Sequence, residues 1–558
     1  MLRSSKIEFD QLFKDLGGFS YFQWKTILLA SIPSFLGGIM VVAPVFTGFT
    51  TEYRCKIPLC DNDLTKYSED FLNFTTPWDE DTNKWSQCQY YSNLNLKANE
   101  CSPQSFNTSY LTTCSEWVYE NKVFQRTTMT QFDLTCRKYW LVSMGTSAYM
   151  IGMFIGAIGI GFVSDYFGRR FGLLLSILLV TFGAVVGAFS PSYEMLLVMR
   201  TITGAGGMGC FQVPFVLAIE YAGPRFRTAC GININIPFAL GECFLGFLAY
   251  CIRDWKYLQL VAVSPAIFAF FSYFFMPESF MWLISKGRNK EAIEVIETIG
   301  SLNGRKVPSY IYSLQEQTIE KESSDEVAKK GLIDVLKSKV ILQRSFILFF
   351  CWITATSVYF GISSYGSKLS ANVFLNFTLL ILVEVPSYFC SVYFIDRMGR
   401  KAWHLFVFTL AGLGCILSAV LPREQSILIL SMNLIGKFGG SAAFGSIFLY
   451  SGELYPTECR AIGVGACSMS ARIGGIISPF INTLKLIYYP LPAFVYGGLS
   501  LVAGCLIILL PETLGTELPQ TIEDSEKFGS DQKICYLHCW NSKKRKLSRL
   551  TDQLEECQ

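Results

Sequence analysis

Twelve long apolar segments restrict what this chain can fold into. A helix needs about 20 mostly apolar residues to cross the hydrocarbon core of a bilayer. In the first half of the chain such segments lie near 26–48, 141–163, 171–190, 195–219, 229–250 and 257–276. In the second half they lie near 345–364, 372–394, 402–421, 426–450, 460–482 and 490–510. Because a backbone in lipid must satisfy its own hydrogen bonds, these segments predict transmembrane helices and an all-α membrane protein.

The composition agrees with a membrane protein and argues against some partners. Of the 558 residues, 51% are hydrophobic and 16% are charged, whereas a soluble chain carries about 25% charged residues. The net charge is +3, so bulk charge gives no reason to expect a nucleic-acid partner. The N-terminal residues before the first apolar segment are polar and mixed in charge, so we expect no cleavable signal peptide.

Six cysteines and two glycosylation sequons share one polar stretch between the first two apolar segments. The sequons begin at Asn73 and Asn107. The cysteines are Cys55, Cys60, Cys88, Cys101, Cys114 and Cys136. An even number of cysteines beside sequons predicts an oxidised extracellular loop with disulfides and glycans. The cysteines permit many pairings, and the sequence does not choose among them.

Basic residues predict the orientation in the membrane. Alternate short connections carry Arg169 and Arg170, and later Arg397, Arg400 and Lys401. By the positive-inside rule these connections and both termini are cytoplasmic, in a multi-pass protein of the plasma membrane. We therefore expect a cytoplasmic N-terminus (1–25), an N-terminal six-helix half (26–276) with an extracellular Cys-rich loop (50–140), a cytoplasmic linker (277–344), a C-terminal six-helix half (345–510) and a cytoplasmic tail (511–558).

Three motifs recur between the halves at offsets of 231, 233 and 234 residues. They are Asp165-x-x-Gly168-Arg169-Arg170 with Asp396-x-x-Gly399-Arg400-Lys401, Glu220 and Arg227 with Glu453 and Arg460, and Pro277-Glu278-Ser279 with Pro511-Glu512-Thr513. Repeats at nearly one offset imply a duplicated six-helix unit. Such a design places a substrate site between the two units, near the middle of the membrane.

The first two motifs predict a conformational lock at the cytoplasmic face. Glycine lets two helices meet tightly, and the charges can pair with neighbouring helix ends. The predicted lock residues are Asp165, Gly168, Arg169, Arg170, Glu220, Arg227, Asp396, Gly399, Arg400, Glu453 and Arg460. The alternative is a basic loop that only sets the topology, but two copies at matched offsets favour the lock.

At this point the chain resembles the major facilitator superfamily over nearly its whole length. Narrower motifs resemble the organic ion transporter family, the solute carrier 22 group, and most of all its carnitine and organic cation branch. These motifs include Gln131-Phe-Asp-Leu-Thr-Cys136, Glu220-Tyr-Ala-Gly-Pro-Arg225-Phe-Arg227, Glu453-Leu-Tyr-Pro-Thr457 and Pro511-Glu-Thr-Leu-Gly515. The resemblance implies two pseudo-symmetric six-helix halves that rock to give alternating access, with no covalent step and no cofactor.

Ionisable residues inside the apolar segments are costly to bury, so they are candidates for substrate binding. They include Glu242, Glu384, Lys437 and Arg472. A guanidinium at Arg472 can clamp a carboxylate, and the resemblance associates arginine there with anion and carnitine carriers. The alternative is an internal ion pair of Arg472 with Glu384 or Glu242.

Glu384 favours an ammonium group instead. Its alternative role is to stabilise helix packing near Pro386. One arginine and two acids together suit a zwitterion that resembles carnitine. The faces of Tyr359, Tyr365 and Phe211 could attract a quaternary ammonium group, although most aromatic rings here pack or face lipid.

Two polar residues at membrane depth, Gln212 and Asn235, could hydrogen-bond either a substrate or another helix. No complete metal site is expected, since Cys535, His538 and Cys539 supply too few ligands in suitable spacing. The sequence also lacks a phosphate-binding Gly-x4-Gly-Lys-[Ser/Thr] loop, which argues against ATP as the driving force.

We therefore predict a secondary transporter, not an enzyme, for small organic cations or carnitine-like zwitterions, with membrane lipids as its surroundings. The sequence does not identify a coupling ion. An organic anion exchanger is the first alternative, favoured by Arg472. A non-transporting membrane sensor that uses the outer loop is the second, and the paired loop motifs argue against it.

Overall fold

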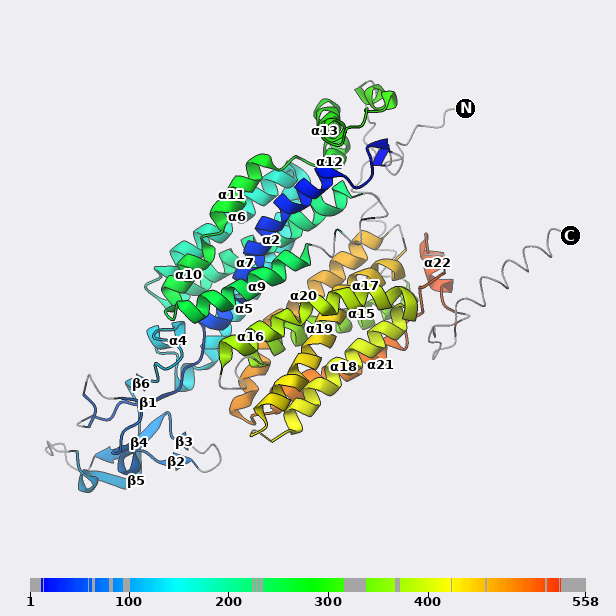
Figure 1. Ribbon diagram of the computed structural model, residues 1–558. Helices are drawn as coiled ribbons and strands as arrows, with labels where there is room; N and C mark the ends of the chain where they lie inside the picture. The colour runs from blue at the N-terminus through cyan, green and yellow to red at the C-terminus, as the bar shows by residue number, and fades with distance from the viewer. Residues whose placement is uncertain are drawn as a thin grey trace.

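The computed structural model describes residues 12–532 except 14, 59, 63–65, 80–83, 94–100, 223–225, 227–229, 231–233, 316–337, 367–371, 423, 457–458, 517–518 and 531. All twelve predicted segments contain helices, in two groups of six (Figure 1). Ten helical stretches are long and apolar enough to cross a membrane, and the shorter apolar helices Asn235–Cys251 and Leu491–Ile507 complete the set. The predicted all-α membrane fold is confirmed.

The first group forms one half of the bundle. Its helices are α2 (Tyr21–Thr47), α5 (Trp140–Phe167), α6 (Arg169–Ala188), α7 (Tyr193–Tyr221), α9 (Asn235–Cys251), and α10 (Trp255–Val263) continued by α11 (Ala266–Phe275). The break between α10 and α11 falls at Ser264 and Pro265. Proline lacks the N–H that would continue the helical hydrogen bonds, so the sixth span is two helices instead of one.

The second group forms the other half. Its helices are α15 (Lys339–Gly366), α16 (Val373–Leu382) continued by α17 (Glu384–Met398), α18 (Arg400–Val420), α19 (Ser426–Leu454), α20 (Arg460–Thr483) and α21 (Leu491–Ile507). The eighth span is broken at Val383, three residues before Pro386. Because Pro386 has no N–H group, it cannot donate the hydrogen bond that would continue α16 through this point. A new helix, α17, therefore begins at Glu384 within the same span.

Each half has its own apolar core. The first half packs α5 and α6 on α7, and α2 on α9; the second packs α15 on α20, and α18 on both α19 and α21. One large buried cluster belongs mainly to the first half, with members such as Leu36 and Leu217, and another to the second half, with Trp352 and Ile447. The halves therefore hold together internally, as a duplicated unit requires.

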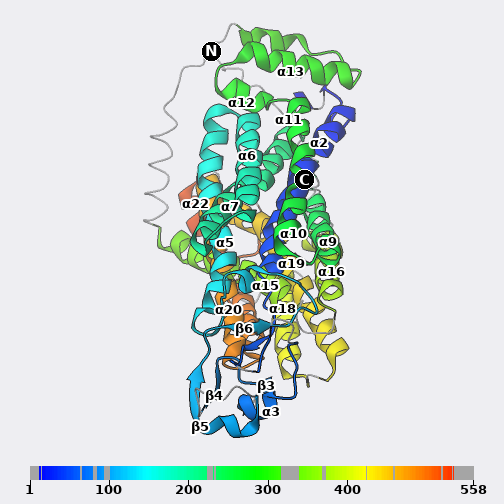
Figure 2. The same cartoon turned by 90° about the vertical axis from the view of Figure 1, so that its left-hand side faces the viewer.

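The predicted outer loop forms a small disulfide-bonded domain at one end of the bundle (Figures 1 and 2). Its short helices are α3 (Leu72–Thr75) and α4 (Thr128–Gln131). Its antiparallel strand pairs are β1 (Tyr53–Cys55) with β6 (Trp117–Tyr119), β2 (Trp78–Asp79) with β3 (Lys84–Trp85), and β4 (Gln89–Asn93) with β5 (Phe106–Thr113). All six predicted cysteines are paired, as Cys55–Cys114, Cys60–Cys101 and Cys88–Cys136.

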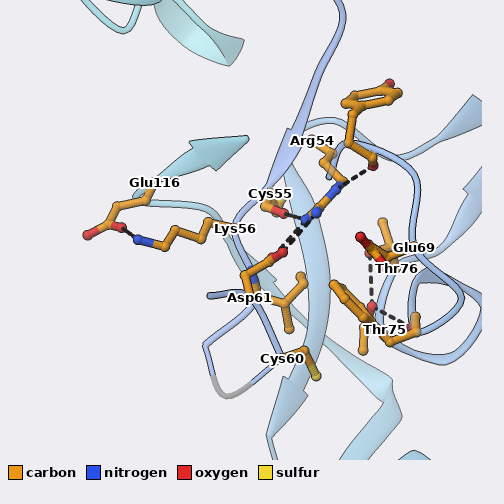
Figure 3. A network of polar contacts seen from close by, with 12 residues as sticks. Arg54, Cys55, Lys56, Cys60, Asp61, Glu69, Thr75, Thr76 and Glu116 are labelled. Carbon is orange, nitrogen blue, oxygen red and sulfur yellow. Dashed lines mark hydrogen bonds and ion pairs between the residues drawn. The ribbon is translucent and has the colours of Figure 1, made fainter. Parts of the chain in front are cut away.

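A buried ion pair organises this domain beside the disulfides (Figure 3). Arg54 donates to both carboxylate oxygens of Asp61, at 2.7 and 2.8 Å. The same guanidinium also donates to the backbone oxygens of Cys55, Lys66 and Tyr67. These acceptors satisfy most of the arginine's donors, so burial of its charge is tolerated. Such short strands could not hold this shape without the cross-links and the polar core.

The opposite end of the bundle carries the linker and tail helices. Part of the predicted linker is helical, as α12 (Phe280–Ser285), α13 (Asn289–Leu302) and a 3₁₀ segment, η3 (Ser309–Gln315). In Figure 2 α12 and α13 lie at the end away from the β-strands. The tail helix α22 (Ile522–Lys527) is attached to the second half because Arg344 donates to the backbone oxygens of Ser525 and Phe528.

Candidate substrate site and conformational motifs

Three predicted ionisable residues meet in the interior, between the halves. Lys437 of α19 and Glu384 of α17 form an ion pair, with 2.7 Å between Nζ and Oε1 and no exposed side-chain surface. The ammonium group also donates to Ser363 Oγ at 2.8 Å and to the backbone oxygen of Tyr359 at 3.2 Å. Both charges are thus compensated inside the second half.

Tyr359 of α15 connects this pair to the first half. Its hydroxyl donates to Glu384 Oε2 at 2.8 Å, and Tyr388 donates to the same oxygen at 3.3 Å. The Tyr359 hydroxyl also lies 3.5 Å from Oε1 of Glu242, which belongs to α9 in the first half. Lys437 Nζ lies 3.4 Å from the centre of the Tyr359 ring, a cation–π geometry. The motif Glu384-Val-Pro-Ser-Tyr388 was the sequence signal that could have pointed to Tyr388.

Glu242 is the least compensated member of the cluster. Its side chain is fully buried. Its Oε2 has no hydrogen-bond partner among the described residues. Since Lys437 pairs with Glu384, Glu242 has no cation of its own in the part of the chain that the structure describes. A buried carboxylate in that situation must either bind a proton or meet a cation supplied from outside.

Arg472 of α20 is buried without an ionic partner. The residue is 7% exposed. Among the residues that the structure describes, its guanidinium forms no ion pair, and its Nε has no hydrogen-bond partner. The alternative prediction of an internal ion pair with Glu384 or Glu242 is therefore wrong, because Glu384 pairs with Lys437 instead. An unpaired buried guanidinium is suited to bind an external anionic group.

Arg472 belongs to α20, which packs on α15, the helix that carries Tyr359. Gly475 and Ile476 follow Arg472 by about one helical turn, so they lie near the same face of α20. A side chain at Gly475 would contact the ring of Phe360 at 3.8 Å, and Phe360 packs edge-on against Tyr359 with 4.9 Å between ring centres. Phe360 and Tyr359 of α15 thus lie between this part of α20 and the acidic cluster.

The remaining predicted binding residues lie elsewhere in the halves. Phe211 stacks on Phe215 and meets Phe238 edge-on, at 6.1 and 5.1 Å between ring centres. The neighbouring Gln212 of α7 has a buried Oε1 without a hydrogen-bond partner in the described part of the chain. Asn235 is the first residue of α9. These contacts give Phe211 a packing role at least.

Tyr365 lines a cavity at the end of the bundle near the β-strands. A cavity of about 140 Å³ lies there between the halves. Its walls include Tyr139, Ser143, Tyr365, Pro479 and Asn482. The Tyr365 hydroxyl donates to the backbone oxygen of Tyr489 at 3.1 Å. The structure therefore separates Tyr365 from the Tyr359 cluster.

The two halves are held together at that same end. Ser143 and Ser147 of α5 donate to the backbone oxygens of Pro479 and Ile476 of α20, at 3.0 and 2.8 Å.

Phe46 of α2 packs edge-on against Phe377 of α16, with 4.7 Å between ring centres. Small hydroxyls and aromatic rings like these carry no distinctive sequence signal, and the sequence analysis missed them.

The predicted lock of the first half is a network around Arg169. Its guanidinium pairs with Asp165 and with Glu220, the latter at 2.8 Å. Gly168, with φ of +111°, lets α5 turn directly into α6. Arg170 stacks its guanidinium over the ring of Tyr273 at 5.0 Å.

The second half repeats this network around Arg400. Its guanidinium pairs with Asp396 at 2.8 Å and with Glu453 at 2.9 Å. Gly399, with φ of +96°, makes the turn between α17 and α18. Arg460 donates to the backbone oxygen of Tyr455 at 3.4 Å. Arg227, its predicted counterpart, lies outside the described residues.

Two further carboxylates complete these networks, and the sequence analysis gave them no role. Glu278 accepts from the backbone N–H groups of Arg169 and Arg170, at 2.9 and 3.1 Å. Glu512 accepts in the same way from Arg400 and Lys401, at 2.9 and 3.0 Å. Each acid caps the start of a helix, where the helix dipole favours negative charge. The repeated Pro-Glu-[Ser/Thr] motif was their signal.

Burial raises the pKa of Glu278, and the N–H groups of Ser279, Arg170 and Arg169 oppose that shift because they stabilise its charge. The described residues contain no cluster of three or more histidine, cysteine or acidic side chains that could hold a metal ion.

Two six-helix halves with matched charged turns, joined across an interior polar cluster, define a membrane transporter of the major facilitator fold. Comparisons with known proteins agree. The family profile described as Sugar (and other) transporter matches residues 99–524. The Organic cation transporter protein of Drosophila melanogaster is 32% identical over 528 residues, which cover 93% of this chain and 95% of that protein. Solute carrier family 22 member 2 of Homo sapiens is 32% identical over 539 residues, which cover 94% and 96%.

Among solved structures, the partially occluded inward open conformation of the xylose transporter XylE from E. coli is similar in fold. Its TM-score is 0.61 at 15% sequence identity, over 89% of this chain and 100% of that one. The chain belongs to the Sugar (and other) transporter family and, within it, to the solute carrier 22 group of organic ion transporters. The predicted family and fold are confirmed, and the assignment to the carnitine branch stays a prediction.

Proposed function

We propose that this chain is a secondary transporter that moves small organic cations or carnitine-like zwitterions across the plasma membrane by alternating access. The observation that carries the proposal is Glu242, a fully buried carboxylate at the junction of the halves that forms no ion pair with any described residue. The relatives reported above include a protein named as an organic cation transporter, which supports the same substrate class.

The charges of the interior favour a positively charged substrate group. Glu384 and Lys437 cancel each other, so Glu242 leaves the cluster with one uncompensated negative charge when it is ionised. A cationic head placed beside Glu242 would supply the missing charge and contact the hydroxyl of Tyr359. A low-dielectric surrounding strengthens this attraction relative to water.

Arg472 extends the proposal to zwitterions. Its buried guanidinium has no ionic partner in the described residues, and its planar donors suit a carboxylate. A molecule with an ammonium group at one end and a carboxylate at the other could compensate Glu242 and Arg472 at once. Simple cations would use only the first of these contacts.

Contacts between the halves support alternating access. Ser143, Ser147 and Phe46 hold the halves together at the end that carries the β-strands. If that end is extracellular, as the disulfides and sequons favour, the outer entrance is closed in this arrangement. Opening it requires these contacts to break while the charged turns at the other end rearrange.

A transport assay with matched substrates tests the proposal. Uptake of carnitine-like zwitterions, quaternary ammonium cations and monocarboxylate anions is measured in cells that express the protein, beside Arg472→Ala. We expect saturable uptake of cations or zwitterions by the unaltered chain, and loss of zwitterion uptake of at least tenfold in Arg472→Ala, about 1.4 kcal/mol. Arg397→Ala, at a surface turn, is the control for removal of an arginine.

Two outcomes contradict the proposal. Absence of saturable uptake for all cations and zwitterions, at normal surface abundance, would remove the cation assignment. Undiminished zwitterion uptake in Arg472→Ala would remove the carboxylate contact. The second candidate function, organic anion exchange, is favoured by the same unpaired guanidinium, and uptake restricted to the anions would select it.

A further inference from the structure

We propose that Glu242 is a proton site and that this carrier exchanges one proton for each organic cation. The inference rests on the proposed function and deepens it, because it names the coupling ion and the residue that binds it. The two acids of the interior cluster, Glu242 and Glu384, differ in the hydrogen-bond donors available to them.

Glu384 already has an ion-pair partner. Its Oε1 pairs with Lys437 at 2.7 Å, and its Oε2 accepts from Tyr359 at 2.8 Å and from Tyr388 at 3.3 Å. The ion pair compensates its negative charge, so Glu384 leaves no unpaired charge in the cluster.

Glu242 shares the hydroxyl of Tyr359 with Glu384 and has no other donor in the described part of the chain. A tyrosine hydroxyl carries a single hydrogen, and the shorter distance assigns the hydrogen of Tyr359 to Glu384. The second oxygen of Glu242 has no partner among the described residues. If Glu242 carries its own proton, that O–H can donate to the Tyr359 oxygen and the chain Glu242–Tyr359–Glu384 becomes complete. Protonation also leaves the cluster with no net charge.

Among the described residues, no other charged group around Glu242 compensates it. The charged or titratable groups that face Glu242 are Tyr359 of α15, Glu384 and Tyr388 of α17, Lys437 of α19 and Cys243 on its own helix. Helices α2 and α16 meet α9 at Gly241 and Gly246 through uncharged atoms, those of Phe35, Ile39, Phe377 and Thr378.

The exchange follows from this balance. When an organic cation binds, the O–H bond of Glu242 breaks, the proton leaves to water, and the carboxylate pairs with the cation. The site carries the same net charge before and after. When the cation leaves on the other side, Glu242 takes up a proton again. Since Glu242 belongs to the first half and Tyr359 to the second, its proton affinity changes as the halves separate.

The test uses the whole purified protein in liposomes and tetraethylammonium, whose charge does not change with pH. With the membrane potential set to zero, a lumen one pH unit more acidic than the outside should drive accumulation of the cation of about tenfold. Glu242→Gln should not accumulate tetraethylammonium, because it lacks both the proton site and the carboxylate that pairs with the cation. Cys251→Ser, at the exposed end of the same helix, should behave like the unaltered chain.

A second measurement does not depend on that variant's folding. Titration of the unaltered protein with tetraethylammonium in weak buffer should release close to one proton per cation bound. Two results would overturn the proton role while leaving the cation carrier intact. One is uptake of tetraethylammonium by the unaltered protein without accumulation, and the other is accumulation that survives in Glu242→Gln. Failure of the unaltered protein to transport any cation or zwitterion would overturn both proposals.

Discussion

Lys437 Nζ lies 2.7 Å from Glu384 Oε1, and the side chains of both residues are fully buried. The two residues come from different helices, α19 and α17. Within a membrane such charges persist only when they compensate each other, so the pair holds the two helices in one relative position. It also leaves Glu242 without an ion pair among the described residues.

Removal of the lysine charge should destabilise the protein. We expect Lys437→Met to cost about 3–5 kcal/mol, because Glu384 would then be buried without its cation. Lys437→Met combined with Glu384→Gln should recover most of that loss, since no uncompensated charge remains. The measurement is the apparent melting temperature of the detergent-purified variants. A double variant no more stable than Lys437→Met alone would contradict the ion-pair interpretation.

The two partners of Arg400 should differ in importance. The side chain of Glu453 is 14% exposed and that of Asp396 is 66% exposed, although both pair with Arg400. A pair in solvent contributes about 0–1 kcal/mol, whereas hydrogen bonds to a shielded charge contribute about 1.5–3 kcal/mol. Glu453→Ala should therefore reduce uptake about tenfold or more at equal surface abundance.

Asp396→Ala is the matched control for this comparison, and it should change uptake less than about threefold. In the first half, Glu220→Ala and Asp165→Ala should repeat the contrast, because Arg169 pairs with the same two kinds of partner. If the variants of the exposed and shielded acids reduced uptake equally, the lock would depend on the number of negative charges near each arginine and not on how well each acid is shielded from water.

The sequence predicted the architecture well because its signals are local. Span length, the charged turns around Gly168 and Gly399, and the presence of disulfides in the outer loop could all be expected from composition and spacing, whereas the order in which the cysteines pair could not. Which buried charged residues pair with each other could not be expected in this way. Whether Glu384 meets Lys437 or Arg472 depends on how α17, α19 and α20 are rotated and packed, and single-sequence spacing carries no information on that.

The same limit explains the missed residues. Glu278 lies 109 residues from Arg169 in the sequence, yet it accepts that residue's backbone N–H. Ser147 lies 329 residues from Ile476, whose backbone oxygen it binds. Serines and prolines are common in membrane helices, so their role at the junction of the halves appears only once both halves are folded.

Glycosylation should report the orientation. Asn73 lies on the surface of the disulfide-bonded domain, and Asn107 is half-buried at the start of β5. If this domain is extracellular, Asn73→Gln should remove one glycan, seen as a shift in gel mobility that glycosidase treatment abolishes. Asn107→Gln tests the second sequon in the same way. A chain from mammalian cells that carries no glycan on either residue would contradict the predicted orientation.

A cross-link between the halves should stop transport. A Cβ placed at Gly475 of α20 would lie 3.6 Å from Cγ of Met150 of α5, so the Cβ atoms of cysteines at the two positions lie at most about 5 Å apart, and a small helix movement brings them to disulfide distance. Oxidation of Met150→Cys with Gly475→Cys should abolish uptake, and mild reduction should restore it. Each single variant under the same treatment is the control. Alternating access requires α5 and α20 to separate in every cycle. Full uptake by a demonstrably cross-linked chain would therefore contradict the rocking of the two halves and require another route for the substrate.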